Sequence, residues 1–257
     1  MKAGLVGYTG FVGSNLMNRV HFSNLYNSKN AEEMKGEHFD LLICAGAPAV
    51  KWKANQEPDQ DWGNIQCLIS NLKEVKANKL ILISTVDVYQ QPRNVTEKTF
   101  IDPEHTDPYG KHRFFLEEFC SQHFKDTLIV RLPGLFGKGL KKNFIYDLIY
   151  DNCLHLTHKD SRFQFYDLSR LWDDLQTAMA NGLNTVNFSS QPISAQEVAA
   201  ECFKTQFTNV TSKEPVAYDM KSEYAACFGG GDGYLYSKNQ IIDQLKAFIE
   251  DEKRGAL

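Results

Sequence analysis

Hydrophobic positions along this chain alternate between short continuous apolar runs and longer stretches in which apolar side chains recur every three or four residues. A continuous run is typical of a strand that is buried on both faces, whereas the wider spacing is typical of an amphipathic helix. Their repeated alternation predicts βαβ units, and therefore an α/β fold built on a parallel sheet.

The predicted elements follow directly from this pattern. Strands are expected at residues 3–6, 21–26, 39–45, 80–83, 127–132 and 185–188. Helices are expected at residues 11–20, 59–77, 109–124, 143–150, 171–180, 195–203 and 238–250. The acidic stretch 30–37 has room for only a couple of helical turns, and residues 163–166 alternate like a strand.

The first predicted strand ends in three glycines, Gly7, Gly10 and Gly13, spaced G-x-x-G-x-x-G. A strand that enters a helix through a glycine turn directs free backbone N–H groups and the positive helix end to one place, which suits a pyrophosphate. We expect Gly7 to form the turn, Gly10 to approach the phosphates, and Gly13 to pack the helix on the sheet. Most dinucleotide folds use G-x-G-x-x-G, and glycine turns also occur for structural reasons, so both interpretations stay open.

Small and polar side chains follow the later strands, at the sheet edge where open parallel sheets bind ligands. The strand at 39–45 leads into small residues, which suit either a flat ring or a simple turn, and the strand at 80–83 leads into hydroxyls and a carboxylate at 84–89. Tyr109 and Arg113 are four residues apart in a predicted helix, so they share one helical face. That spacing places a phenol beside a positive charge.

Composition and charge narrow the range of partners. The 28 basic and 32 acidic residues give a formal net charge of −4, which offers no electrostatic attraction for nucleic acid or an anionic membrane. No apolar run reaches the ~20 residues that span a bilayer. Six scattered cysteines without a C-x-x-C pair indicate free thiols, and the histidines show no metal-ligand spacing, so no metal is expected. A first strand that begins at residue 2 or 3 leaves no room for a signal peptide, which predicts a cytoplasmic protein.

The ordered motifs together resemble the extended short-chain dehydrogenases/reductases, which include nucleotide-sugar epimerases, dehydratases and reductases. The resemblance covers nearly the full chain and rests on residues 7–13, 45–47, Asn64, 84–89, Thr96, Glu97, Tyr109, Gly110, Glu117, Arg131, Gly137, Asp174 and Leu175. The short passage before Phe39 and the Lys142-Asn143-Phe144 sequence make the chain most similar to the dTDP-4-dehydrorhamnose reductase branch.

The resemblance implies a Rossmann-type doubly wound parallel sheet with a small C-terminal substrate lobe. We expect residues 1–137 to form the dinucleotide-binding core. Residues 138–257 would return to the sheet and form the lobe, and the whole chain would be a single compact subunit because no clear linker divides it. A homodimer through the helices at 59–77 and 109–124 is also implied.

The resemblance assigns the chemistry to Tyr109, as proton donor or acceptor during hydride transfer, and to Thr85, which would hydrogen-bond the reacting oxygen. The family places a lysine four residues after the tyrosine, whereas this chain has Arg113. Arginine keeps the charge and can donate to ribose hydroxyls, but it is not interchangeable with an ammonium group, and Lys111 lies on another side of the helix. Three alternatives remain open: a working enzyme that uses Arg113, a slow or specialised enzyme, and a protein that binds the cofactor without catalysis.

The implied cofactor is NADP or NAD. The end of the second strand, residues 27–29, lacks the carboxylate that binds the ribose diol of NAD, and its hydroxyl and lysine suit a 2′-phosphate, although both are ordinary in a solvated turn. The implied cofactor-binding residues are Gly7, Thr9, Gly10, Phe11, Val12, Gly13, Asn27, Ser28, Lys29, Ala45, Gly46, Ala47, Ser84, Tyr109, Arg113 and Pro133. The implied substrate-binding residues are Thr85, Asp87, Tyr89 and Asn143.

The sequence thus predicts an NAD(P)-dependent oxidoreductase or epimerase that acts on a small-molecule substrate, a nucleotide sugar or a related carbonyl or hydroxyl compound. One competing hypothesis is a dinucleotide-binding sensor or partner subunit that has lost catalysis because the family lysine is Arg113. Another is a structural assembly factor with an empty site, which would show no dinucleotide affinity.

Overall fold

The computed structural model describes residues 1–255, which divide into two compact units. The first unit comprises residues 1–91, 98–132 and 172–187. The second comprises residues 92–97, 133–171 and the chain from residue 188 onward. The assignment of a cofactor-binding role to residues 1–137 and a substrate-binding role to the remainder stays a prediction.

The first unit is built on a six-stranded sheet in the order β10-β6-β4-β3-β1-β2, and every neighbouring pair in it is parallel. Its strands are β1 (Ala3–Val6), β2 (Asn24–Tyr26), β3 (His38–Cys44), β4 (Lys76–Thr85), β6 (Thr127–Leu132) and β10 (Thr185–Asn187). Strands on either side of β1 follow it in the sequence, which is the doubly wound arrangement. The predicted α/β fold class is confirmed.

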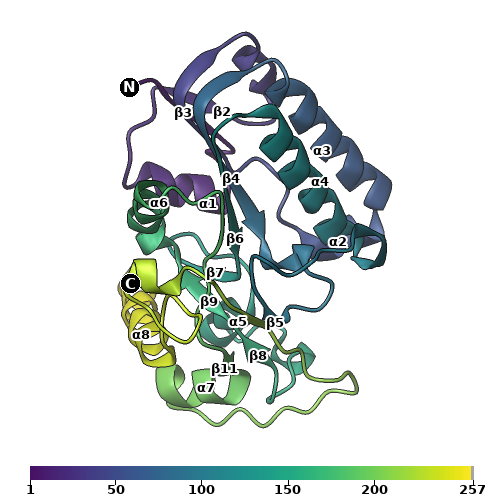
Figure 1. The fold of residues 1–257 in the computed structure, drawn as a ribbon. Helices are drawn as coiled ribbons and strands as arrows, with labels where there is room; N and C mark the ends of the chain where they lie inside the picture. The colour runs from purple at the N-terminus through teal and green to yellow at the C-terminus, as the bar shows by residue number, and fades with distance from the viewer. Residues whose placement is uncertain (256–257) are drawn as a thin grey trace. The chain divides into compact units, whose positions relative to one another are not determined.

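Helices cover both faces of this sheet (Figure 1). On one face lie α3 (Pro58–Leu72) and α4 (Pro108–His123), with the short α2 (Lys51–Gln56) against both. On the other face lie α1 (Phe11–Met17) and α6 (Leu171–Ala180), and Arg19, two residues after α1, forms an ion pair with Asp173 of α6. Apolar side chains of α3 and α4 pack on the sheet in one core, which includes Ile65, Leu68, Leu72, Leu116, Cys120, Leu42, Leu80, Leu82 and Ile129.

Some predicted boundaries are wrong. The helix predicted at 59–77 ends at Leu72, because Lys76 and Ala77 instead begin β4 and pair with His38 and Phe39 of β3. The helix predicted at 11–20 ends at Met17, and the strand predicted at 21–26 shortens to β2. By contrast, β6, α6 and α7 have the predicted bounds.

The second unit combines three helices with short strand pairs. The helices are α5 (Phe144–Tyr150), α7 (Ala195–Phe203) and α8 (Lys238–Gly255). The pairs are β5 (Arg93–Val95) with β12 (Asp219–Met220), β7 (Gly134–Phe136) with β9 (Phe165–Asp167), and β8 (Arg162–Phe163) with β11 (Ile193–Ser194). The strand-like run 163–166 is split at Gln164, because Phe163 belongs to β8, which pairs with β11, and Phe165 begins β9, which pairs with β7. The buried side chain of Gln164 donates to the backbone oxygens of Ser190 and Met220.

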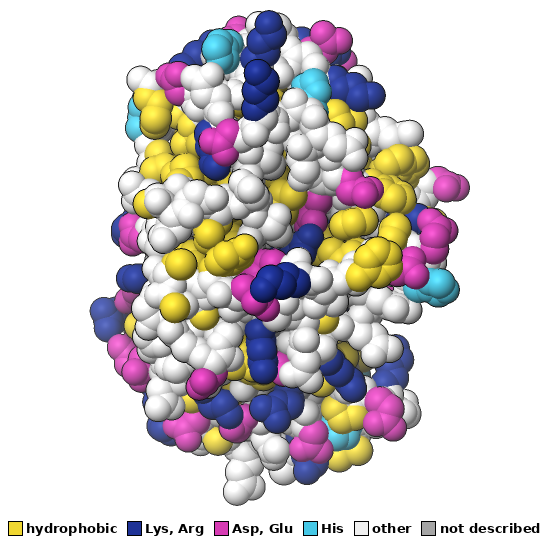
Figure 2. Space-filling view, in the orientation of Figure 1, with side chains coloured by type: hydrophobic (Ala, Val, Ile, Leu, Met, Phe, Trp, Pro, Cys, Tyr) yellow, Lys and Arg dark blue, Asp and Glu magenta, His cyan; other side chains and the backbone are white. Residues whose placement is uncertain are grey.

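Short 3₁₀ turns connect these elements, at η1 (Ala31–Met34), η2 (Val86–Val88), η3 (Pro103–His105), η4 (Leu154–Leu156), η5 (Leu168–Arg170) and η6 (Ala225–Phe228). Basic and acidic side chains are interspersed over the face shown in Figure 2. Within residues 1–255, no helix combines the length and the apolarity that crossing a membrane requires.

Candidate active site

The glycine turn joins β1 to α1 at the carboxyl edge of the sheet. Gly7 has a φ of +86°, and a Cβ there would lie 2.3 Å from the backbone oxygen of Ala45. A Cβ on Gly13 would lie 2.2 Å from the oxygen of Gly7. Only glycine fits at either position, so the turn and the first helical turn are pressed together against the end of β3. Thr9 and Gly10 at the tip are exposed, and the first N–H groups of a helix have no intrahelical acceptor.

The end of β2 lies beside this turn, because the N–H of Gly7 donates to the oxygen of Tyr26 at 2.7 Å. Asn27 folds its turn locally: its Oδ1 accepts from the N–H of Lys29 at 2.8 Å, and its Nδ2 donates to the hydroxyl of Tyr8 at 3.1 Å. Ser28 and Lys29 are exposed. The predicted residues 7–13 and 27–29 are therefore brought together at one edge.

The ends of β3 and β4 supply the next predicted residues. Ala45 continues from β3 and donates its N–H to the oxygen of Val6 at 2.9 Å. Ser84, at the end of β4, is buried, and its hydroxyl donates to Oε1 of Glu117 at 2.5 Å. Thr85 caps η2, because its Oγ1 accepts from the N–H of Asp87 at 3.2 Å. The end of β4 thus carries a hydroxyl that is bonded to α4 and a second that caps η2.

Tyr109 sits at the first turn of α4 and is only 9% exposed. Asn55 of α2 holds this turn in place, because its side-chain Oδ1 accepts from the N–H of Tyr109 at 3.0 Å. This turn packs against η2, so that a Cβ on Gly110 would lie 1.9 Å from the backbone oxygen of Asp87, and Thr85 acts to lower the pKa of the Tyr109 phenol. The two residues that the resemblance assigns as the reacting pair are therefore brought near each other by the packing of α4 on η2.

Arg113 lies against Tyr109, with its Cζ 3.9 Å from the centre of the phenol ring. The predicted placement of a positive charge beside the phenol is confirmed. Its Nη1 donates to Asp61 Oδ2 at 2.5 Å and to the backbone oxygen of Tyr109 at 3.1 Å, while Nη2 donates to Asp61 Oδ1 at 2.8 Å and to the backbone oxygen of Pro48. The guanidinium is 3% exposed, and its Nε has no hydrogen-bond partner within residues 1–255.

Asp61 of α3 anchors this group. It also accepts from Nδ1 of His112 at 2.7 Å, so one buried carboxylate holds two neighbouring side chains of α4. Burial acts to raise the pKa of Asp61, but the hydrogen bonds from Arg113 and His112 outweigh it and leave that pKa below its usual value. Asp61 is therefore a carboxylate at neutral pH, and it neutralises the charge of Arg113 locally.

A second positive charge reaches Tyr109 from α2. Lys51 donates from Nζ to Asp87 Oδ1 at 2.7 Å, and Thr85 donates from Oγ1 to Asp87 Oδ2 at 3.4 Å. The side chain of Asp87 is 17% exposed and that of Lys51 is 42% exposed. Lys111, by contrast, pairs with Glu104 at 3.0 Å on another side of the helix.

Burial raises the pKa of Tyr109 above its ordinary value. The charge of Arg113 opposes this rise, the carboxylate of Asp87 adds to it, and the charge of Lys51 and the side chain of Thr85 oppose it further. Because burial dominates, the phenol keeps its proton at neutral pH. The arrangement suits a group that donates a proton.

Tyr89 belongs to a separate buried network. Its hydroxyl accepts from Nη1 of Arg131 at 2.7 Å and hydrogen-bonds Asn187, while Arg131 pairs with Glu117 through Nη2 at 2.6 Å. Burial acts to lower the pKa of Arg131, but Glu117 reverses this and raises it. This network fixes β4, β6 and α4, and a substrate contact for Tyr89 stays a prediction.

The remaining predicted residues lie in the second unit. Pro133 follows β6 directly. Asn143 caps α5, because its Oδ1 accepts from the N–H groups of Ile145 and Tyr146 at 3.0 and 3.2 Å, and its Nδ2 donates to the oxygen of Leu135 at 2.7 Å. The structure thus gives Asn143 a capping role, and its contact with a substrate stays a prediction.

The sequence did not predict α2, nor the contacts that Lys51 and Asn55 of α2 and Asp61 of α3 make at the site. Lys51 and Asn55 lie in a six-residue helix that is too short to show a periodic apolar face, with Ala54 as its one buried side chain. The run of good helix formers at 51–56 was the available signal. Asp61 lay within the predicted helix at 59–77 and showed no sign of its partner Arg113, which is 52 residues away.

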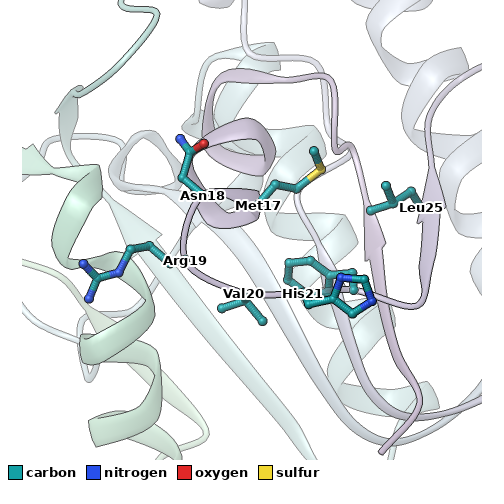
Figure 3. A pocket seen from close by; sticks show the side chains of 7 residues that line it. Met17, Asn18, Arg19, Val20, His21 and Leu25 are labelled. Atoms are coloured by element: carbon teal, nitrogen blue, oxygen red, sulfur yellow. The ribbon is translucent and has the colours of Figure 1, made fainter.

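A hollow of about 400 Å³ lies elsewhere on the first unit, beside the end of α1 (Figure 3). Residues 17–22 and Leu25 line it. The side chain of Arg19 turns away toward α6, where it pairs with Asp173. This hollow lies at the end of α1 opposite the glycine turn and gathers none of the predicted site residues.

Alanine at Gly110 is expected to lower the free energy of unfolding by about 3 kcal/mol. A Cβ there would lie 1.9 Å from the backbone oxygen of Asp87, so α4 and η2 would have to separate. Gly63→Ala is the matched control: a Cβ there meets nothing within 4 Å in the middle of α3, so it should raise stability by about 0.5–1 kcal/mol. Urea unfolding measures both, and equal stability of the two variants would contradict the close packing at Gly110.

No family model and no curated protein sequence matches this chain. Solved structures of low sequence identity match its fold over nearly the whole length. dTDP-4-dehydrorhamnose reductase from Bacillus anthracis, in complex with NADP, has a TM-score of 0.74 at 17% identity, covering 97% of this chain and 99% of that one.

Solved structures of two epimerases match the fold of this chain about as well. UDP-glucuronic acid 4-epimerase from Bacillus cereus, a variant in complex with a UDP-sugar and NAD, has a TM-score of 0.73 at 16% identity, with 99% of each chain covered. UDP-glucose 4-epimerase from Thermotoga maritima, with UDP-glucose, has a TM-score of 0.69 at 13% identity, with 100% of each chain covered. The structural resemblance that the sequence motifs predicted is confirmed.

Proposed function

Since the chain has the fold of nucleotide-sugar reductases and epimerases, we propose that it is an NAD(P)-dependent oxidoreductase or epimerase that acts on a nucleotide sugar. The observation that carries the proposal is the packing of the first turn of α4, which carries Tyr109, against η2, which Thr85 caps at the carboxyl end of β4, with Arg113 3.9 Å from the phenol ring. Carboxyl ends of parallel strands are where such folds bind their ligands.

The glycine turn fits a dinucleotide. Its tip at Thr9 and Gly10 is exposed, and the close packing of Gly7 and Gly13 leaves no side chain between the backbone and a phosphate. Residues 9–13 would hold the pyrophosphate, and residues 45–47 would face the adenine side of the sheet edge. Ser28 and Lys29 are exposed beside this turn, which favours the 2′-phosphate of NADP.

When bound, the nicotinamide supplies or accepts the hydride. Thr85 would hydrogen-bond the reacting oxygen of the substrate. Tyr109 would donate its proton to that oxygen as a carbonyl is reduced, and accept it as an alcohol is oxidised. The raised pKa of Tyr109 keeps the phenol protonated and so favours its role as donor.

A second candidate function, a dinucleotide-binding sensor without catalysis, is favoured by one observation. Both Nη atoms of Arg113 donate to groups of the protein itself, namely Asp61, Tyr109 and Pro48. In this candidate, Arg113 does not take over the ribose-binding role of the family lysine. Turnover of a 4-keto nucleotide sugar by the wild-type protein separates the two candidates.

Calorimetric titration with NADPH and NADH tests the proposal first. We expect the wild-type protein to bind NADPH more tightly than NADH. Gly10→Asp should weaken NADPH binding by at least about tenfold, or ~1.4 kcal/mol, because a carboxylate at the exposed tip repels the pyrophosphate. Gly63→Asp, which places the same charge on the exposed surface of α3, should bind like the wild type. Absence of binding by either nucleotide would overturn the oxidoreductase proposal.

A further inference from the structure

The first turn of α4, which carries Tyr109, has no cap from the residue that precedes it. Asp107 holds the capping position, and aspartate is a favoured capping residue, but its side chain forms no capping hydrogen bond within residues 1–255. Pro108 begins the helix and has no N–H, so the first backbone donor of α4 is the N–H of Tyr109. A donor at this position has no acceptor inside its own helix, so its partner must come from another part of the chain or from water.

Asn55 of α2 is that partner, because its Oδ1 accepts from the N–H of Tyr109 at 3.0 Å. The two residues are 54 positions apart in the sequence, and α2 lies against α4 (Figure 1). A side-chain oxygen that accepts from the first free N–H does what a capping residue does in its own helix. Here the cap comes from a second helix, so the same bond fixes the backbone of Tyr109 to α2.

The chain segment 48–55, which contains Asn55, also contacts the charge that lies on the phenol ring. The backbone oxygen of Pro48 accepts from Nη2 of Arg113, and the Cζ of Arg113 lies 3.9 Å from the centre of the Tyr109 ring. One segment thus binds the backbone of Tyr109 at its end and the guanidinium on the Tyr109 ring at its beginning.

The same segment also reaches η2. Lys51 lies one helical turn before Asn55, on the same face of α2, and its Nζ donates to Asp87 Oδ1 at 2.7 Å. Asp87 belongs to η2, which Thr85 caps. Segment 48–55 therefore links η2 to α4, the two elements that meet at the predicted reacting pair.

We infer that Asn55 is a positioning residue that holds the Tyr109 side chain in place for proton transfer. It acts through its bond to the backbone of Tyr109. Without this bond, the first turn of α4 loses its cap and is free to fray, as helix ends do. A displacement of about 1 Å at a reacting group lowers a rate by up to ~100-fold. The effect on turnover rests on the proposed function, whereas the hold on Tyr109 is a property of the protein alone.

A cap that only stabilises α4 has different consequences from one that positions Tyr109. Loss of a purely stabilising cap lowers the free energy of unfolding but leaves the ring of Tyr109 where it is in the folded protein. Loss of a positioning cap also moves the ring relative to Arg113. Because an aromatic ring shifts the NMR frequencies of nearby nuclei, the Nε–H signal of Arg113 beside the ring reports this movement.

The test needs no ligand. Amide hydrogen exchange at Tyr109 measures the hydrogen bond, and the Nε–H signal of Arg113, identified by its loss in Arg113→Lys, measures the ring position. In Asn55→Ala we expect amide exchange at Tyr109 to be faster by about tenfold and the Arg113 signal to shift. Asn55→Asp keeps an oxygen that accepts from the N–H, so it should restore both measurements to near the wild-type values.

Two matched controls separate position from stability. Ser194→Ala removes the cap of α7, whose Oγ accepts from the N–H of Glu197 at 3.2 Å, and should lose a similar amount of stability while leaving both measurements at Tyr109 unchanged. Gln56→Ala changes the exposed neighbour of Asn55 in α2 and should match the wild type in both. With an active enzyme, Asn55→Ala should lower kcat by about 10- to 100-fold with unchanged affinity for NADPH, and Asn55→Asp should recover it.

The outcomes are separable from those of the proposed function. Unchanged amide exchange or an unchanged Arg113 signal in Asn55→Ala would overturn the inference, as would the same changes in Ser194→Ala or a failure of Asn55→Asp to restore the wild-type values. Unchanged turnover in Asn55→Ala, in an enzyme that is active, would overturn it as well. The expected changes in a protein that turns over no nucleotide sugar would support the hold on Tyr109 and count against the proposed function alone.

Discussion

Replacing Asp61 by asparagine is expected to lower the free energy of unfolding by about 3–5 kcal/mol. The carboxylate is 4% exposed and forms two hydrogen bonds with a guanidinium that is 3% exposed. Asparagine keeps the shape but removes the charge, which leaves Arg113 buried without a counter-ion. The loss is large because the desolvation of a charge is no longer offset by its partner. Urea unfolding, followed by circular dichroism, measures it.

The matched control is Asp59→Asn, on the exposed surface of the same helix, which should remain within about 0.5 kcal/mol of the wild type. The double variant Asp61→Leu with Arg113→Met should recover most of the lost stability, since it removes both charges together. Additive losses in the double variant would show that the two residues do not act as a pair.

The stability that Asp61→Asn loses also depends on pH, and it decreases in acid. The folded-state pKa of Asp61 lies below its ordinary value of 3.8, so the carboxylate contributes stability that is fully present above that value and is lost as the pH falls through the folded-state pKa. The difference between wild type and Asp61→Asn should therefore be constant near neutrality and shrink below about pH 4. A difference that stays constant into strong acid would contradict this.

Replacing Tyr109 by phenylalanine is expected to lower kcat by about 100- to 10,000-fold, while the affinity for NADPH stays unchanged. Phenylalanine keeps the ring against Arg113 but removes the hydroxyl that would transfer the proton. Tyr150→Phe, at a tyrosine of α5 that is 51% exposed, is the control and should keep full turnover. Full turnover in Tyr109→Phe would place the proton transfer elsewhere.

The wild-type pH profile gives the direction of this chemistry. Carbonyl reduction needs the protonated phenol, so its rate should fall as the pH rises through the pKa of Tyr109, which lies above the ordinary value of 10.0. Alcohol oxidation needs the phenolate and should accelerate with rising pH. If the rates of reduction and oxidation changed in the same direction with pH, Tyr109 would not be the proton donor and acceptor.

The position of Arg113 illustrates how far the sequence reaches. A spacing of four residues within one predicted helix was enough to place its charge beside Tyr109, and the structure confirms that contact. The partner that engages the guanidinium, Asp61, lies 52 residues away on another helix. The sequence therefore left open a working enzyme that uses Arg113, a slow or specialised enzyme, and a cofactor-binding protein without catalysis. It did not show the buried ion pair that holds the guanidinium.

The sequence by itself determined the features that depend on neighbouring residues: the alternation of strands and helices, the glycine turn after β1, and the polar ends of the parallel strands. Each arises from a local spacing, because apolar periodicity selects a helix or a strand and a positive φ selects glycine. Only the tertiary structure decided where the charges go. It brings Lys51 to Asp87 across 36 residues and Asp61 to Arg113, since such pairs form when separate elements pack and leave no periodic trace in the chain.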